Sequence, residues 1–170
     1  LINNNFKRAN GRVNLDHTVS KFFDFSVKLN YAQTLLDRVA DDNAFATPIQ
    51  LIAQSPLTPA YLEDGEPNPN TIYFNGLLAE RYNKSNVNTS RTISSFMANL
   101  HILPDMLTFT SMVGIDNFNQ REEERQSPKT DDGQPAGNGT YRSLAYTVMM
   151  ADNYLSFDKT LSEQHVINAV

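Results

Sequence analysis

The sequence predicts an all-β protein, a segment of an antiparallel up-and-down transmembrane β-barrel. Long stretches alternate apolar and polar residues with a period of two, as strands with one apolar face do. Very short turns alternate along the chain with long connections at 36–85 and 121–139. Charged side chains avoid the apolar row of the clearest strands.

Composition excludes several classes of protein. The 170 residues are 40% hydrophobic and suffice for one ordinary domain. The net charge of -5 is spread along the chain, so no nucleic-acid partner is expected. The absence of cysteine excludes disulfides, thiolate metal sites and a cysteine nucleophile. Mean hydropathy is -0.44, and no apolar run reaches the roughly 18 residues of a spanning helix. Barrel strands escape such a scan because only one side faces lipid.

The first hairpin gives the clearest alternation. A strand is expected over Gly11–Val19, starting as early as Phe6, with its odd-numbered residues apolar. Lys21 and Phe22 form a short connection. The second strand then alternates one apolar and one polar row, which are Phe23, Phe25, Val27, Leu29 and Tyr31 against Asp24, Ser26, Lys28, Asn30 and Ala32.

The long connection from Leu36 to about Ser85 is rich in Pro, Asn, Asp and Gly and is expected to be a structured loop. Within it, Asn43–Gln54 could form a helix starting after Thr47, because threonine at an N-cap before proline is favourable. A second helical turn is expected over Gly76–Tyr82.

Four further strands are expected after this loop. The third covers Thr89–Leu103, a tight turn follows at Pro104-Asp105, and the fourth runs from Leu107 to about Gln120. Arg121–Gly139 has neither period and is expected to be an exposed loop, with Glu122-Glu123-Glu124 as a solvated face rather than a cation site. The remaining expectations are a fifth strand with its apolar row on Leu144, Tyr146, Val148 and Met150, a bulge near Asp152, a turn at Phe157–Lys159, and a sixth strand from Gln164 to Val170.

The asymmetry of the connections predicts an orientation. Outer-membrane barrels have short periplasmic turns, longer extracellular loops, and strands of roughly 9 to 11 residues across the apolar layer. The apolar rows are therefore expected to face lipid. The polar row would face a hydrated lumen, and Arg12, Asp16, Asp24 and Lys28 are the lumen-facing candidates.

Six strands would leave two open edges, which hydrocarbon does not tolerate. The chain opens on Leu1 and stops at Val170 inside an expected strand. Residues 1–170 are therefore expected to be part of a larger barrel, with the remaining strands missing.

A family resemblance narrows the function. The string Gly-Arg-Val-Asn-Leu-Asp-His at Gly11–His17, followed after a hairpin by Asp-Asn-Ala-Phe-Ala-Thr-Pro-Ile-Gln-Leu at 42–51, resembles the SusC/RagA family of TonB-dependent outer-membrane transporters. The stretch from Pro56 to Tyr61 before Glu63-Asp64-Gly65, and the strand entry His165–Val170, are similar to barrel segments of that family.

The resemblance implies a 22-stranded barrel that encloses an N-terminal plug, in an outer membrane of the Bacteroidetes type. A SusD-like surface lipoprotein would close over the top. Oligosaccharides or peptides would pass through the assembly, with energy relayed by TonB through the plug. The chain departs from the family in lacking a plug, a TonB box and most strands. It would be one sector of the wall, in contact with outer-membrane lipid.

No catalytic, cofactor or metal site is expected. His17, His101 and His165 lie on different strands without metal-ligand spacing. No phosphate loop, nucleophile elbow or HExxH motif occurs, and Asp41-Asp42 fits turn chemistry better than acid/base chemistry. The sequence therefore predicts no enzyme. One alternative stays open, a soluble all-β glycan-binding module of the cell envelope, whose strands would be shorter and whose loops would be more even.

Overall fold

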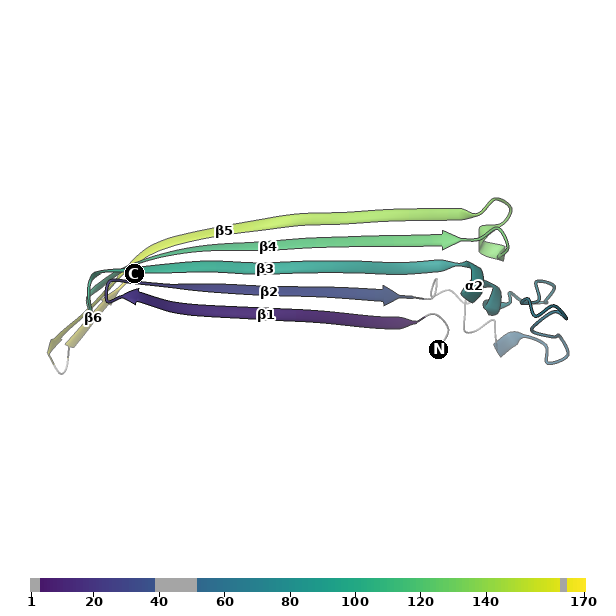
Figure 1. Cartoon of the computed structure of the whole chain (residues 1–170), viewed down its shortest axis with the longest axis horizontal. Coiled ribbons are helices and arrows are strands. Elements are labelled where there is room, and N and C mark those ends of the chain that lie inside the picture. The colour runs from purple at the N-terminus through teal and green to yellow at the C-terminus, as the bar shows by residue number, and fades with distance from the viewer. Residues whose placement is uncertain (1–3, 39–51, 163–164) are drawn as a thin grey trace. The chain divides into compact units, whose positions relative to one another are not determined.

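The computed structural model describes residues 4–38, 52–162 and 165–170. They form one open, antiparallel sheet of six strands in chain order (Figure 1). This confirms the predicted all-β, up-and-down architecture. The strands are β1 (Asn5–Ser20), β2 (Phe23–Asp37), β3 (Lys84–Leu103), β4 (Leu107–Gln126), β5 (Asn138–Ser162) and β6 (His165–Ala169).

The chain divides into two compact units, and the longer strands contribute to both. One unit comprises 1–8, 34–89 and 120–144, and holds the long connections. The other comprises 9–33, 90–119 and 145–170, and holds the short turns. The predicted asymmetry between short and long connections is therefore confirmed. We call these the loop unit and the turn unit.

Two of the three predicted short turns are confirmed, each with a local reason. At the first, the Phe22 amide donates to Ser20 Oγ at 3.2 Å. At the second, Asp105 has a φ of 64°, a left-handed conformation that aspartate tolerates better than most residues. The Met106 amide closes this turn on Leu103 O at 3.0 Å.

The predicted turn at Phe157–Lys159 is wrong. β5 continues through these residues and pairs with β6, with Phe157 opposite Ala169 and Asp158 opposite Asn168. Between β5 and β6 the register shifts between Thr160 and Ser162, and the bulge near Asp152 stays a prediction. A charged pair after an aromatic residue resembled a turn, but backbone pairing with β6 compensates for its low strand propensity.

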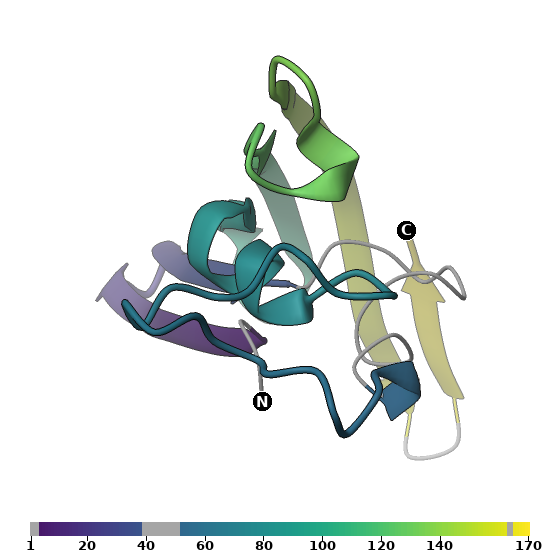
Figure 2. The same cartoon turned by 90° about the vertical axis from the view of Figure 1, so that its right-hand side faces the viewer.

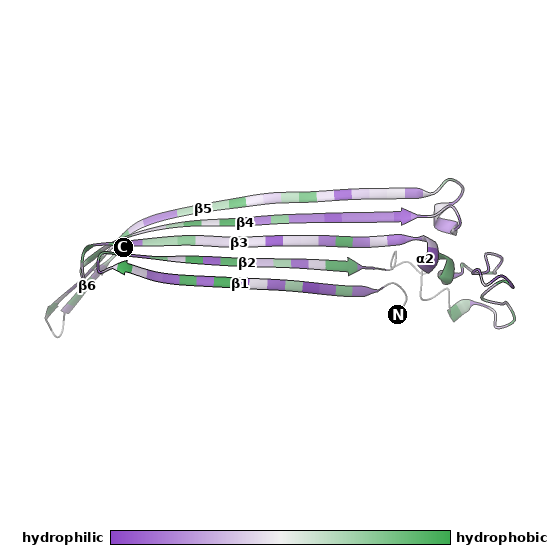
Figure 3. Ribbon diagram, in the orientation of Figure 1, coloured by the Kyte–Doolittle hydropathy of each residue, from purple (hydrophilic) through white to green (hydrophobic). Residues whose placement is uncertain are grey.

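The predicted loop at Arg121–Gly139 is also too long. β4 continues to Gln126, and β5 already begins at Asn138. Figure 3 shows that β4 becomes hydrophilic toward this end. An alternation of apolar and polar residues therefore does not mark this part of the sequence as a strand. β3 likewise begins at Lys84 rather than Thr89. Polar strand ends with ion-pair partners on neighbouring strands explain both differences.

The loop unit confirms the predicted helical turn as α2 (Gly76–Tyr82), visible in Figure 2 with the short helix η1 (Asp131–Gly133). Buried Asn75 is the N-cap of α2, and its Oδ1 accepts from the Leu77 amide at 3.1 Å. Its Nδ2 donates to Ala60 O and Asn68 O, at 3.0 and 2.9 Å. One amide thus joins the helix to the preceding loop. Of the helix expected in 43–54, all but 52–54 lies outside the described residues.

The sheet is a single layer with almost no core of its own. Among the described residues, the only buried hydrophobic side chains are Leu78 and Val87, both in the loop unit. Large hydrophobic side chains along all six strands are exposed. None of the helices described is long and apolar enough to cross a membrane.

Candidate functional site

The turn unit presents two chemically different faces. Ring contacts connect β1, β2 and β3 on one of them, His17 to Phe25 at 5.5 Å between centroids and Phe25 to Phe96 at 6.1 Å. On β4 and β5, Asn117 Nδ2 donates to Thr147 Oγ1 at 2.8 Å on this same face. Successive residues of a strand point to opposite faces, so these contacts determine on which face each remaining residue of the turn unit lies.

We call the first surface the apolar band. Its members are mostly aliphatic or aromatic, and most of the large ones are exposed. Along β2 the band runs from Phe23 to Tyr31, close to the roughly 9 to 11 residues that a strand needs to cross a bilayer. Its large members are Val13, Leu15 and Val19 of β1; Phe23, Phe25, Val27, Leu29 and Tyr31 of β2; Phe96, Leu100 and Ile102 of β3; Leu107, Phe109, Val113 and Ile115 of β4; and Met149, Leu155 and Phe157 of β5.

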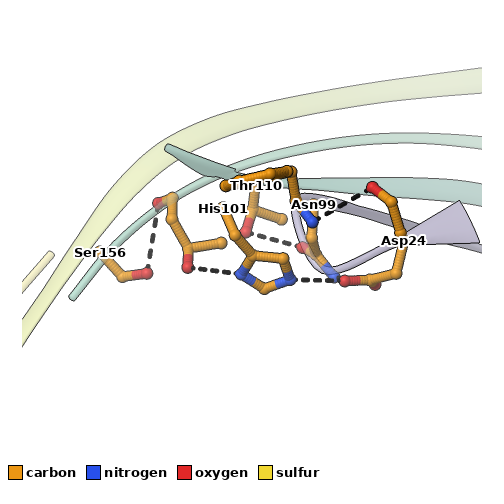
Figure 4. A network of polar contacts seen from close by, with 8 residues as sticks. Asp24, Asn99, His101, Thr110 and Ser156 are labelled. Atoms are coloured by element: carbon orange, nitrogen blue, oxygen red, sulfur yellow. Dashed lines mark hydrogen bonds and ion pairs between the residues drawn. The ribbon is translucent and has the colours of Figure 1, made fainter. Parts of the chain in front are cut away.

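The opposite, polar face carries a hydrogen-bond network near the short turns (Figure 4). Asp24 Oδ1 accepts from Asn99 Nδ2 at 2.8 Å, and its Oδ2 lies 2.7 Å from His101 Nε2. Thr110 Oγ1 donates to Asn99 Oδ1 at 2.9 Å, and His101 Nδ1 lies 3.0 Å from Thr108 Oγ1. The carboxylate can only accept, so Nε2 carries a hydrogen. The network therefore joins β2, β3 and β4 through their side chains.

Only one of the four lumen-facing candidates takes part in this network. Asp24 is its centre, whereas Arg12, Asp16 and Lys28 are exposed. Alternation places all four on the polar face, because His17 and Phe25 contact each other on the apolar band. The structure does not test whether this face lines a lumen, which stays a prediction.

The apolar row predicted for β5 lies on the polar face, so it does not share a face with the apolar rows of β1 to β4. The Phe118 and Tyr146 rings stack at 4.9 Å and 16°. A Cβ built on Gly114 would lie 3.5 Å from Met150 Cε. Phe118 and Gly114 share their side of β4 with Asp116, which pairs with Arg91 of β3. The register of β5 against β4, and not the hydrophobicity of β5, decides which row of β5 lies on the same face of the sheet as the apolar band.

We call this second surface the Tyr146 patch. It comprises Ile93, Phe118, Tyr146, Val148 and Met150. All but Phe118 are exposed, from 41% for Ile93 to 54% for Val148.

An ion pair interrupts the Tyr146 patch, because Asp116 lies between Gly114 and Phe118 on the same side of β4. Arg91 Nε donates to Asp116 Oδ1 at 2.9 Å, and its Nη2 donates to Asp116 Oδ2 at 2.5 Å. This fork geometry holds the guanidinium in one orientation. The sequence analysis did not identify this ion pair, because Arg91 and Asp116 lie on the two different strands of a hairpin. The tight turn at Pro104-Asp105 nevertheless predicts that these two strands lie side by side.

Charges in the loop unit are paired across strands. Glu122 accepts from Arg38 and lies 3.9 Å from Arg142 Nη1, while Glu123 Oε2 accepts from Lys84 Nζ at 2.9 Å. Consecutive strand residues point to opposite faces, so the two glutamates pair with basic side chains on opposite faces of the sheet. Over residues 4–38, 52–162 and 165–170, no group of three or more acidic or histidine side chains could hold a metal ion.

Comparisons with known proteins reveal a relationship only at the level of fold. No protein-family model matches the sequence, and no curated protein matches it. A solved structure described as the RagAB peptide transporter superposes with a TM-score of 0.73 at 15% sequence identity. The match covers 97% of this chain and 20% of that chain, so the chain spans about a fifth of the length of the protein it resembles.

The Asp24 network generates a stability prediction. Replacing Asp24 with alanine removes the acceptor for both His101 Nε2 and Asn99 Nδ2, and unpaired donors are costly. The groups are partly exposed, so Asp24→Ala should lower the free energy of unfolding by only about 1 kcal/mol. Urea unfolding of the full-length protein, followed by circular dichroism, measures this. Asp16→Ala, an exposed aspartate on the same face, is the control, and an equal loss in both variants would contradict a special role for Asp24.

Proposed function

We propose that the chain forms a sector of the wall of an outer-membrane transport barrel, with the apolar band against lipid and the polar face toward the interior. The observation that carries this proposal is the apolar band itself. An exposed apolar surface that extends over five strands exceeds the patches of a few hundred square ångströms found on soluble monomers. Lipid or another large apolar surface must cover it.

The open alternative, a soluble glycan-binding sandwich, fits less well. A sandwich buries its apolar face against a second sheet about 10 Å away. The described residues form a single sheet, and its strands reach 20 residues in β3 and β4 and 25 in β5, longer than the usual 3 to 10. Strands of this length suit a wall that continues past the bilayer.

The finer proposal assigns the chain to a transporter of the SusC/RagA type. The similarity of fold to the RagAB peptide transporter supports it, together with the sequence resemblance. The larger protein would include a plug that contacts TonB, and would work with a SusD-like lipoprotein to import oligosaccharides or peptides. We assign no catalytic step or cofactor to this sector.

Charge substitution tests the placement of the band. Leu29→Arg would put a cation against lipid, which costs about 2–4 kcal/mol at the bilayer midplane. Asn30→Arg is the matched control, because it adds the same side chain at the neighbouring position on the polar face. In the full-length protein, Leu29→Arg should sharply reduce the folded, heat-modifiable species in outer-membrane fractions, and Asn30→Arg should leave it near the unsubstituted level. Equal accumulation of both variants would contradict the proposal.

The long loop between β2 and β3 is the proposed contact for the lipoprotein lid. Leu57 and Ile72 of this loop are 92% and 76% exposed. Leu57→Asp combined with Ile72→Asp should release the lid in co-purification from detergent extracts, whereas Glu63→Ser at an exposed position of the same loop should retain it.

The proposal also predicts that protease added to intact cells cleaves this loop once the lid is removed. Retention of the lid by the double variant, or protection of the loop in lid-free cells, would exclude this contact.

A further inference from the structure

We propose that Met97, Met112 and Met150 form a thioether site for a soft monovalent cation, Cu(I). The three residues belong to β3, β4 and β5 of the turn unit, and they are three of the five methionines in the chain. Alternation places all three on the polar face of the sheet. The inference goes beyond the proposed function and does not rest on it, because it depends only on how these strands pair within the turn unit.

The hairpin of β3 and β4 places Met97 opposite Met112. Three cross-strand contacts define its register, each two residues further along both strands than the last: the Met106 amide to Leu103 O, His101 to Thr108, and Asn99 to Thr110. Two more residues along each strand lie Met97 and Met112. Directly opposite residues have Cβ atoms about 4.5–5.5 Å apart, so the two thioethers can meet.

Met150 extends over β4 beside this pair. A Cβ built on Gly114 would lie 3.5 Å from Met150 Cε and 3.9 Å from Met150 Cβ, so the Met150 side chain lies against this glycine. Gly114 and Met112 are two residues apart on one strand and therefore share a face. Diagonal neighbours across two strands are within reach of long side chains. Because Gly114 has no side chain, the Met150 thioether has space to approach that of Met112.

The chemistry of the three groups indicates which cation they would hold. Thioether sulfur is a soft ligand, and soft ligands select Cu(I) over Mg²⁺, Ca²⁺ and Mn²⁺, which prefer oxygen. Met150 is 51% exposed, and Met97 and Met112 are half-buried, so a cation can reach the sulfurs from solvent. Asp152, which is exposed, follows Met150 by two residues and adds a negative charge on the same side of β5.

Packing alone accounts less well for these methionines. Methionine commonly fills gaps in hydrophobic cores, but the described part of the turn unit has no buried hydrophobic side chain. The next cross-strand pair on this face, Asn99 and Thr110, is polar and hydrogen-bonded. The finding that the described acidic and histidine side chains form no metal site concerns other ligand types and does not bear on thioethers.

Copper binding by the purified full-length protein in detergent tests the site. Cu(I), kept reduced with ascorbate, is titrated in competition with the chromophoric chelator bicinchoninate. The triple variant Met97→Leu, Met112→Leu and Met150→Leu should bind one Cu(I) fewer than the unsubstituted protein, because leucine preserves volume and apolar character but has no sulfur. The matched control, Met106→Leu with Met149→Leu, removes the other two methionines of the chain and should keep the full stoichiometry.

Two further readouts identify the ligands. Each of the three single replacements should weaken binding of this Cu(I) by at least about tenfold, since loss of even an outer-shell partner costs that much at metal sites. In protein labelled with selenomethionine, X-ray absorption at the copper edge should show selenium neighbours, and the triple variant should lose them. Excess Zn²⁺ should leave the Cu(I) bound, because zinc is less soft.

Several results would overturn the site. Equal copper binding by the triple variant and the unsubstituted protein is one, and an equal loss in the control variant is another. Copper with only nitrogen or oxygen neighbours, or copper displaced by zinc, would also exclude a thioether site. Circular dichroism checks that the triple variant is folded, and the single variants decide if it is not. None of these results bears on the orientation of the sheet, which the substitutions at Leu29 and Asn30 test.

Discussion

The constraint on which the rest of the structure depends is that one face of a single-layer sheet is apolar and nothing in the described chain buries it. Leu78 and Val87 are the only buried hydrophobic side chains described, and neither belongs to this face of the turn unit. Burial of apolar surface is the main favourable contribution to folding, at about 25 cal/mol per Å². The sheet therefore needs a lipid or protein surface against its band, and the function proposed for it follows from that need.

The two units meet this constraint with different chemistry. In the turn unit, hydrophobic rows alternate with a polar network, so the two faces suit different solvents. In the loop unit, cross-strand ion pairs such as Lys84–Glu123 replace the apolar row, and Asn75 and Asn68 organise the loop by hydrogen bonds to its backbone. Exposed ion pairs contribute little stability individually, so the loop unit depends more on these buried amides.

The sequence predicted what depends on local periodicity and failed where neighbouring strands decide. The alternation of Phe23–Tyr31, the turn at Pro104-Asp105 and the helical turn at Gly76–Tyr82 all have local causes, and all were correct. The row containing Tyr146 and Met150 was identified but expected on the same face as the other apolar rows, because a period of two gives two rows without saying which faces which solvent. Register against β4 supplies that information. The Asp24 network was missed except for its carboxylate, since its other members are polar residues common in any strand.

Lipid contact along β2 tests the central claim most directly. The chain contains no tryptophan, so single substitutions at Val27, Lys28, Leu29 and Asn30 each add a distinct fluorophore to it. With tryptophans elsewhere in the full-length protein replaced, quenching by brominated lipid should alternate, strong at Val27 and Leu29 and weak at Lys28 and Asn30. Uniform quenching at the four positions, or none at any of them, would contradict a sheet with one face in lipid.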